Sequence, residues 1–245
     1  TKSKNFFFGI PDVITSNTAP QNLLHNDDLS IVTENGQAFA DESAKDIGGN
    51  IKYVNSRELK TQWLAKLYVH NTPHCIAAYL GSICKLTYLH EGMSSSNIYT
   101  IVENAMFEMG EALVNVYELD REFIRWYSKK ELSRFSNKLL FDPISRVARE
   151  PFRKLGLTNR LIGAAQLCLQ AGIIPKNIIT GIMAAFSYDD INDNDSNIKI
   201  LMDSLSPADF LSLVINIHSH ESLYELIIKN WNTNKEKLSE IINER

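Results

Sequence analysis

Cysteine is scarce in this sequence, with three residues in 245, and no two of them form a Cys-x-x-Cys pair. Cys75 and Cys84 stand within apolar sequence, which is typical of buried free thiols, and the odd total argues against a disulfide framework. No apolar run approaches the ~20 residues that a membrane-spanning helix needs. The N-terminal segment has too short an apolar core for a signal peptide. We therefore predict a cytoplasmic protein with no membrane partner.

Charge of one sign is not in excess either. The chain has 25 basic and 29 acidic residues, and its net charge is -4. This balance gives no general attraction to nucleic acid or to anionic lipid, and the three scattered tryptophans define no platform for stacking bases. We therefore predict that nucleic acid is not a partner and that any basic site is local.

A dinucleotide-binding fingerprint is also missing. No Gly-x-Gly-x-x-Gly occurs, and no strand-turn-helix unit of the kind that binds a dinucleotide pyrophosphate is present. No residue of this chain is therefore assigned to cofactor binding. The sequence begins at Thr1 and soon reaches the apolar FFFGI, from which we expect a fragment of a longer protein.

The hydrophobic pattern divides the chain into two parts. Residues 1–55 have the pattern of strands and turns, with strands expected in FFFGI, DVITS and LSIVTE, a hairpin turn at Asn35-Gly36 and a further break at Gly48-Gly49. From Ser56 the period becomes helical. The prediction is a mainly α fold: a short β segment at 1–55, followed by a helical substrate-binding and catalytic domain at 56–245.

Within the helical part, the pattern predicts helices at about 96–117, opened by Ser95 or Ser96, and then at 119–127 and 129–138. A polar connection follows around Asp142-Pro143, and another helical region spans about 157–188. An acidic loop at 189–197 precedes two or three short terminal helices. The strands and helices do not alternate as they do in a doubly wound parallel sheet.

Lys66, Asn71 and His74 form an ordered set that suits chemistry on an alcohol carbon. On a helix, Asn71 lies about 140° and His74 about 80° around from Lys66, so all three can face one cleft. A neutral lysine can accept the hydroxyl proton while a hydride leaves the same carbon, if burial or a nearby cation lowers its pKa. Asn71 and His74 can stabilise charge on the oxygen. Spacing alone also fits a surface lysine, a helix-kink asparagine and a buried histidine.

Pro73 stands inside this set. A proline within a helix removes one N–H and presses on the preceding turn, which here frees a backbone carbonyl near Val69. We therefore expect an irregular helix at the site.

A second group is basic. Arg146, Arg149, Arg153, Lys154 and Arg160 gather in DPISRVAREPFRKLGLTNRLIGAA, although the whole chain is mildly acidic. Arginine binds phosphate or carboxylate through two parallel hydrogen bonds, and lysine adds a point charge. The composition alone also allows a solvated helix face paired with Glu150.

No metal site is predicted. His70 and His74 have the i, i+4 spacing of helical zinc ligands, but the glutamate of a His-Glu-x-x-His motif is absent. The acidic stretch 189–197 lacks the glycine and the terminal glutamate of an EF-hand loop.

Together the two groups resemble the C-terminal domain of the polyol-specific long-chain dehydrogenases, and most of all the branch that acts on mannitol 1-phosphate. The resemblance covers nearly the whole chain. Lys66, Asn71 and His74 match the family's Lys-x4-Asn-x2-His motif, and REPFRKL at 149–155 and NRLIGAA at 159–165 match two later segments. In the early motif, Pro11-Asp12-Val13-Ile14 keeps Asp12 but has valine in place of arginine. Pro73 replaces a small residue, often glycine.

This resemblance implies a multi-helical fold of the 6-phosphogluconate dehydrogenase C-terminal type, and it implies roles for individual residues. Lys66 is then the general acid/base, and Asn71 and His74 polarise the substrate oxygen. The implied substrate-binding residues are Asp12, Arg146, Arg149, Arg153 and Lys154, with Arg149 and Arg153 on the phosphate.

The implied reaction is the NAD-dependent interconversion of mannitol 1-phosphate and fructose 6-phosphate, without a metal. NAD is held by an N-terminal Rossmann domain outside this chain, so we expect the fragment alone to be inactive. Three alternatives stay open: a mannitol 2-dehydrogenase domain, a hexuronate reductase domain acting on fructuronate or tagaturonate, and a non-catalytic helical module that binds a sugar phosphate or a protein.

Overall fold

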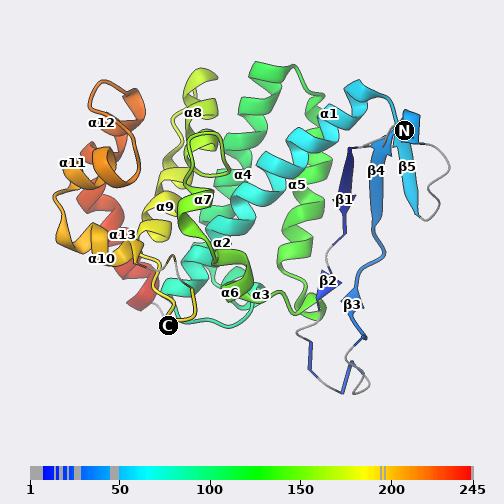
Figure 1. Cartoon of the computed structure of the whole chain (residues 1–245), viewed down its shortest axis with the longest axis horizontal. Coiled ribbons are helices and arrows are strands. Elements are labelled where there is room, and N and C mark those ends of the chain that lie inside the picture. Colours follow the sequence, from blue (N-terminus) through cyan, green and yellow to red (C-terminus); the bar gives the residue numbers. More distant parts are fainter. Residues whose placement is uncertain are drawn as a thin grey trace, which may run out of the picture.

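A computed structural model shows a helical body with a narrow β segment along one side (Figure 1). The structure describes residues 8–243, except 14, 17–18, 21, 25–28, 45–49, 194 and 196. The prediction of a mainly α fold with a short β segment near the N-terminus is confirmed. Part of FFFGI and the break at Gly48-Gly49 lie outside the described residues.

The β segment contains two small sheets. The strands are β1 (Gly9–Asp12), β2 (Thr15–Ser16), β3 (Val32–Thr33), β4 (Gln37–Asp41) and β5 (Ile51–Val54). β4 lies between β1, which is antiparallel to it, and β5, which is parallel to it, while β2 pairs with β3. Pro11 lies in β1, an edge strand, where a missing N–H is tolerated.

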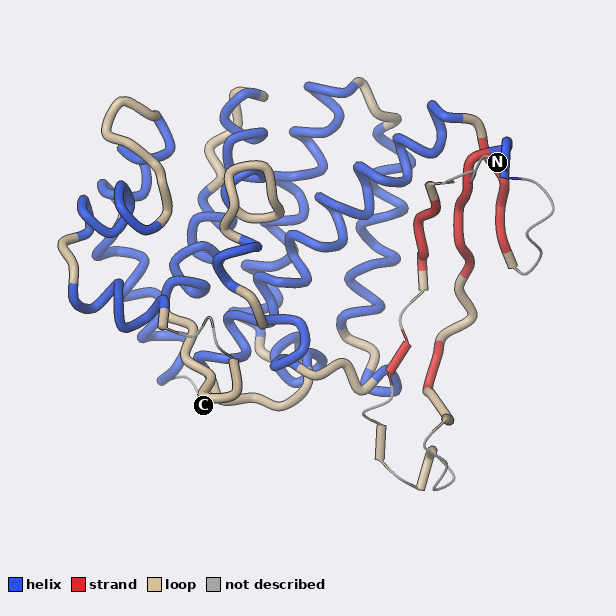
Figure 2. Tube along the Cα trace, in the orientation of Figure 1, coloured by secondary structure: helices blue, strands red, loops and turns tan. Residues whose placement is uncertain are grey.

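The hairpin turn predicted at Asn35-Gly36 is wrong. β1 and β2 pair with β4 and β3 respectively, so residues 34–36 form a bend in the returning chain and not the end of a hairpin (Figure 2). A Cβ atom on Gly36 would lie 2.5 Å from the Val13 Cβ. Glycine is needed here because two segments of the backbone approach closely. An Asn-Gly pattern in the sequence does not distinguish this requirement from a turn.

Seventeen helical segments are described, and twelve of them are given first. In chain order they are α1 (Ser56–Leu64), the π-helical segment η2 (Ala65–Asn71), α2 (Thr72–Ile83), α3 (Leu89–Met93), α4 (Ser96–Tyr117), α5 (Arg121–Phe135), α6 (Ile144–Ala148), α7 (Pro151–Lys154), α8 (Ile162–Gln170), α9 (Lys176–Phe186), α12 (Ser222–Lys229) and α13 (Trp231–Asn243). The segments η1 (Glu42–Ala44), η3 (Lys138–Leu140), α10 (Ile198–Ser204), α11 (Pro207–Asp209) and η4 (Phe210–Val214) complete the described helices.

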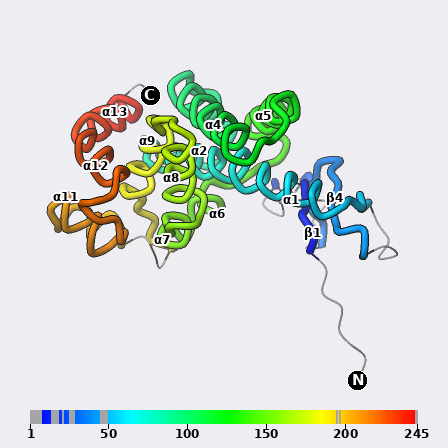
Figure 3. Tube along the Cα trace, turned by 90° about the horizontal axis from the view of Figure 1, so that it is seen from above, coloured from blue at the N-terminus to red at the C-terminus, as the bar shows by residue number. Residues whose placement is uncertain are grey.

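The core of the body forms around α2, which packs against α4, α6 and α9 (Figure 3). Nine of the twelve residues of α2 are buried. Its crossing with α9 is close, since a Cβ atom on Gly181 would lie 2.4 Å from the Ile76 Cγ1. This close packing fixes the position of α2 in the body. It also fixes the end of η2, which leads directly into α2.

Several predicted helix limits are confirmed and others are wrong. The helix expected at 96–117 is α4, and Ser95 is its N-cap. The two helices expected at 119–127 and 129–138 are one, α5. The region 157–188 holds two helices, α8 and α9, separated near Gly172, which has φ +75°. The C-terminal part has more segments than the two or three predicted. Among the described residues, no helix is long and apolar enough to cross a membrane.

Candidate active site

A cavity of about 290 Å³ collects most of the residues that the sequence singles out. Seven of the eight predicted catalytic and substrate-binding residues line it. They are Lys66, Asn71, His74, Arg146, Arg149, Arg153 and Lys154. His70, Arg160, Val13 and Val147 complete the lining. The two motifs, about eighty residues apart in sequence, therefore meet in space.

The catalytic set stands on an irregular helix. Lys66, His70 and Asn71 belong to η2, and α2 follows at once with Pro73 and His74. A π-helix inserts an extra residue per turn and often occurs at functional sites. Pro73 lacks the N–H that regular helical bonding requires. The expectation of an irregular helix next to Pro73 is therefore confirmed.

Lys66 has an environment suited to proton transfer. Burial lowers the pKa of its ammonium to about 8, and the nearby Arg134 and Lys130 act in the same direction, whereas Glu131 and Asp12 oppose the shift. A group with this pKa is present as both amine and ammonium near pH 8 and still holds a fraction of the amine at neutral pH. It can accept or donate a proton as a reaction requires.

Two histidine–carboxylate pairs lie side by side next to Lys66. His70 Nδ1 contacts Glu131 Oε2, and His74 Nε2 lies 2.8 Å from Asp142 Oδ2. The two rings are 4.9 Å apart between centroids, and Phe135 stacks on His74 at 5.0 Å. Both imidazoles are therefore fixed in position by a carboxylate and an aromatic ring.

Asp142 joins the catalytic set to the basic group. Its Oδ1 accepts a hydrogen bond of 2.6 Å from Arg146 Nη2, while its Oδ2 bonds to His74. These two contacts lower the pKa of the buried Asp142 to about 2 against the effect of burial. Asp142 is a carboxylate over the working range of pH, and it aligns His74 and Arg146 together.

Lys154 is an unusual cation because its side chain is buried and unpaired. The residue is 2% exposed, and its Nζ has no hydrogen-bond partner. Burial lowers its pKa to about 8, and Arg160 and Arg153 act in the same direction. An unpaired buried ammonium costs free energy, which an anion entering the cavity would offset.

The arginines differ in how far they are already neutralised. Arg153 Nη2 lies 2.6 Å from Glu150 Oε2. Among the described residues, no carboxylate lies within salt-bridge distance of Arg149 or Arg160. The cavity thus combines two paired arginines, Arg146 and Arg153, with cationic groups that have no carboxylate partner. This arrangement suits a phosphate or a carboxylate.

Asp12 is the predicted site residue that lies outside the cavity lining. Its Oδ2 accepts a hydrogen bond of 2.6 Å from Lys130 Nζ, and its Oδ1 accepts one of 2.7 Å from Arg134 Nη1. Its neighbour Val13 faces the cavity instead. In this structure Asp12 joins β1 to α5.

The residues predicted as catalytic or substrate-binding did not include His70, Glu131, Asp142 or Arg160. His70 was weighed only as a zinc ligand, and it bonds to a carboxylate; no group of three potential metal ligands occurs among the described residues. Glu131 lies 61 residues from His70 in sequence, so no local pattern predicts their contact. Arg160 belongs to the basic group, so the sequence contained a signal by which it could have been added to the predicted site.

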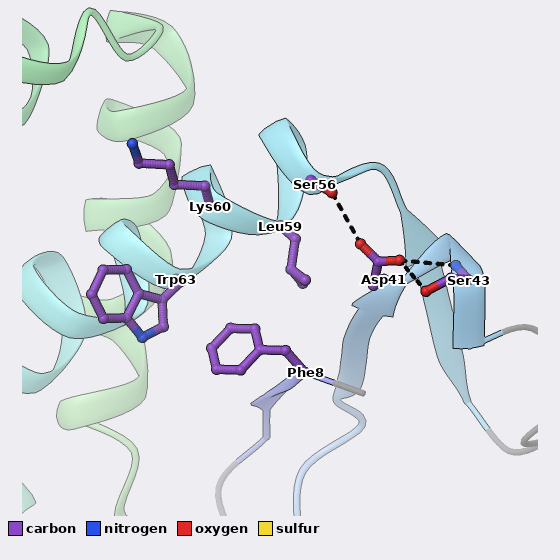
Figure 4. Close-up of a pocket in the computed structure, with 7 residues that line it drawn as sticks. All are labelled: Phe8, Asp41, Ser43, Ser56, Leu59, Lys60 and Trp63. Atoms are coloured by element: carbon purple, nitrogen blue, oxygen red, sulfur yellow. Dashed lines mark hydrogen bonds between the residues drawn. The ribbon is translucent and has the colours of Figure 1, made fainter. Parts of the chain in front are cut away.

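Another cavity, of about 430 Å³, lies between α1 and the sheet (Figure 4). Phe8, Leu59 and Trp63 form its apolar side. Its carboxylate, Asp41, is already bonded to Ser43 and Ser56. Lys60 also lines it, but the cavity holds none of the residues that the sequence singles out.

The comparisons with known proteins identify the family of the chain. Residues 59–237 match the model of the mannitol dehydrogenase C-terminal domain. The mannitol-1-phosphate 5-dehydrogenase of Caldanaerobacter subterraneus is 32% identical over 182 residues, which are 74% of this chain and 47% of that protein. The enzyme of the same name from Geobacillus stearothermophilus is 34% identical over 196 residues, with 78% and 50% covered.

Two solved structures share the fold. Mannitol 2-dehydrogenase of Pseudomonas fluorescens, in a ternary complex with NAD and D-mannitol, has a TM-score of 0.72 at 16% identity, covering 98% of this chain and 55% of that one. A D-sorbitol dehydrogenase in substrate-free form also has a TM-score of 0.72, at 17% identity, with 97% and 54% covered.

These findings define a helical domain of the kind that mannitol dehydrogenases carry at the C-terminus. The chain belongs to the mannitol dehydrogenase C-terminal domain family. It spans about half the length of the relatives it matches.

Proposed function

We propose that this chain is the substrate-binding and catalytic domain of an NAD-dependent polyol dehydrogenase that interconverts mannitol 1-phosphate and fructose 6-phosphate. The observation that carries the proposal is that one cavity contains both a group suited to proton transfer and a cluster of cations. Lys66, with its lowered pKa, lies in the same lining as the unpaired, buried Lys154 and four arginines. A polyol phosphate has a hydroxyl group that can react at Lys66 and a phosphate dianion that Lys154 and the arginines can bind.

The proposal assigns no residue of this chain to the dinucleotide. β5 enters α1 through Asn55, without the glycine-rich loop that close approach of a pyrophosphate requires. Cofactor binding belongs in this proposal to a separate N-terminal Rossmann domain. NAD, when bound there, accepts or supplies the hydride.

In the oxidation direction, neutral Lys66 accepts the proton of the substrate hydroxyl, while the hydride leaves the same carbon and a carbonyl forms. Asn71 donates an amide N–H to the oxygen as negative charge develops on it. His74, aligned by Asp142, hydrogen-bonds the same or an adjacent oxygen. In the reverse direction the Lys66 ammonium returns the proton.

The remaining cavity residues bind the substrate in this proposal. Arg149 and Arg153 contact the phosphate, and Arg146 and Lys154 position the substrate. Asp12, which the family resemblance places near the substrate, supports the site through its contacts with Lys130 and Arg134.

The proposal is tested by NADH oxidation with fructose 6-phosphate, using the full-length parent polypeptide, its Lys66→Ala variant and this chain alone. We expect activity in the parent, a loss of at least ~100-fold in the variant and no turnover by the chain alone. Full activity of Lys66→Ala would refute the mechanism.

The phosphate assignment needs a separate comparison. Rates on fructose 6-phosphate, fructose and a hexuronate are measured for Arg149→Ala and Arg153→Ala, with Arg125→Ala as the matched control, because Arg125 is exposed and pairs with Glu122 on α5. Loss on the phosphate ester alone supports the assignment. Unchanged use of the ester by both variants would contradict it, and preferred use of a hexuronate would assign the arginines to a carboxylate.

A further inference from the structure

A buried network of charges joins η2 to α5. Its centre is Glu131 of α5, which is fully buried. None of its members except His70 and Lys66 lines the cavity. The family motif does not include Glu131, and the proposed reaction as described so far does not use it.

Both carboxylate oxygens of Glu131 are occupied. Oε2 contacts His70 Nδ1, while Oε1 accepts a hydrogen bond of 2.7 Å from Arg134 Nη1 and lies 3.2 Å from Lys130 Nζ. Burial raises the pKa of Glu131, but the hydrogen bond from His70 and the nearby charges of Arg134 and Lys130 hold it well below its usual range. Glu131 is therefore a carboxylate.

This carboxylate decides which nitrogen of His70 carries the proton. Burial and the nearby Lys66 lower the pKa of His70, so its ring is neutral. A neutral ring facing a carboxylate donates from Nδ1, which leaves Nε2 as a hydrogen-bond acceptor. Since His70 lines the cavity, Glu131 fixes how this ring can interact there.

Glu131 also acts on Lys66 directly. Four charged groups of the network surround Lys66: Glu131 and Asp12 favour its ammonium form, whereas Arg134 and Lys130 disfavour it. On the cavity side, the groups that share its lining are the cations Arg146, Arg149, Arg153, Lys154 and Arg160 and the two histidines. Glu131 is thus the strongest opposing charge in a cationic environment.

We infer that Glu131 is a positioning residue of this site: its Oε2 holds His70, its Oε1 contacts Arg134 and Lys130, and its negative charge offsets the two positive charges in the surroundings of Lys66. The catalytic meaning of this inference rests on the proposed function. The charge balance itself does not, and it can be measured without turnover.

The test is the titration of Lys66 in the chain as it stands. The rate at which acetic anhydride modifies Lys66 is followed against pH by mass spectrometry of the Lys66 peptide. We expect a midpoint near pH 8 in the wild type. Glu131→Gln lowers the midpoint by about one unit, because an opposing charge is lost, whereas Lys130→Gln raises it, because a like charge is lost.

Lys129→Gln is the matched control, since Lys129 adjoins Lys130 on α5 and is exposed; its midpoint stays at the wild-type value. An unchanged midpoint in Glu131→Gln, or a shift of Lys130→Gln in the same direction as Glu131→Gln, would overturn the inference. If Glu131→Gln does not fold by circular dichroism, Lys130→Gln decides, because Lys130 is partly exposed and its loss leaves a folded chain.

A second readout follows His70. Its ring ¹⁵N shifts should show a neutral ring protonated on Nδ1 in the wild type and in Glu131→Asp, and a changed proton distribution in Glu131→Gln. In the full-length parent, the pH limb of kcat/KM moves with the labelling midpoint. A parent inactive on every polyol would refute the proposed function and leave the titration result standing.

Discussion

At the scale of single residues, the site depends on two buried lysines of different use. Lys66 and Lys154 have pKa values lowered to about 8, in both cases chiefly by burial. Lys66 is surrounded by charges of both signs, whereas the Lys154 Nζ has no hydrogen-bond partner. The surroundings of Lys66 suit a group that changes its protonation state. Those of Lys154 suit a group that binds an anion.

The pH dependence follows from the Lys66 pKa of about 8. Oxidation of mannitol 1-phosphate needs the neutral amine, so its kcat/KM should fall as the pH decreases below 8. Reduction of fructose 6-phosphate needs the ammonium, so its kcat/KM should fall as the pH rises above 8. Initial rates of the full-length parent between pH 6 and pH 10, in both directions, check this. Limbs of the same sign in both directions would contradict it.

Lys154→Met should separate affinity from stability. The change keeps the length of the side chain and removes a buried charge without a partner, so we expect the free energy of unfolding to rise by about 1 kcal/mol. Phosphate binding should weaken by at least ~10-fold, since charged hydrogen bonds contribute about 1.5–3 kcal/mol. Denaturant unfolding and calorimetric titration with inorganic phosphate measure the two effects.

Lys129→Met is the control for this change because Lys129 is exposed on α5. It should alter neither quantity. Lower stability of Lys154→Met with unchanged phosphate affinity would show that Lys154 has a structural role instead.

At the scale of elements, local patterns predicted what lies within one helix and missed what depends on contact between helices. The motif at Lys66 and the basic group were found because each lies within a short stretch of sequence. The single helix α5 was predicted as two, with the division at Ser128, inside the polar stretch SKK at 128–130. In the structure these polar residues are part of the helix, since Lys130 and Arg134 bond to Asp12 and Glu131.

The site also depends on how closely α2 and α9 approach. Gly181→Ala would place a methyl group 2.4 Å from Ile76 Cγ1, two residues beyond His74. We expect a loss of about 1–3 kcal/mol in the free energy of unfolding, measured by urea denaturation. Gly92→Ala is the control, because the nearest atom to its Cβ would be 3.7 Å away. Equal stability of the two variants would show that α9 moves to accommodate the methyl group.

At the scale of the whole molecule, two apolar cores of very different size are present. The larger fills the helical body, and the smaller consists of Ile10, Phe39, Val54 and Leu59, between the sheet and α1. Four residues bury little apolar surface. The β segment is therefore held to α5 largely by polar contacts, of which those of Arg134 with Asp12 and Glu34 are the most direct.

Arg134→Gln should release the β segment while the body stays folded. The change leaves Asp12, Glu34 and Glu131 short of a counter-charge, and breaking buried pairs costs about 3–5 kcal/mol. Amide hydrogen exchange should accelerate in β1 and β4 and stay slow in α2 and α9. The control is Arg125→Gln, at an exposed pair that contributes about 0–1 kcal/mol. Equal protection of β1 in both variants would contradict this account.

Arg134 therefore acts in two places at once. The same guanidinium that ties Asp12 and Glu34 to the body also borders Glu131, and through Glu131 it belongs to the surroundings of Lys66. A displacement of the β segment would leave this guanidinium without two of its counter-ions and make the surroundings of Lys66 more positive. The proton affinity of Lys66 consequently depends on whether the N-terminal strands are packed against the helical body.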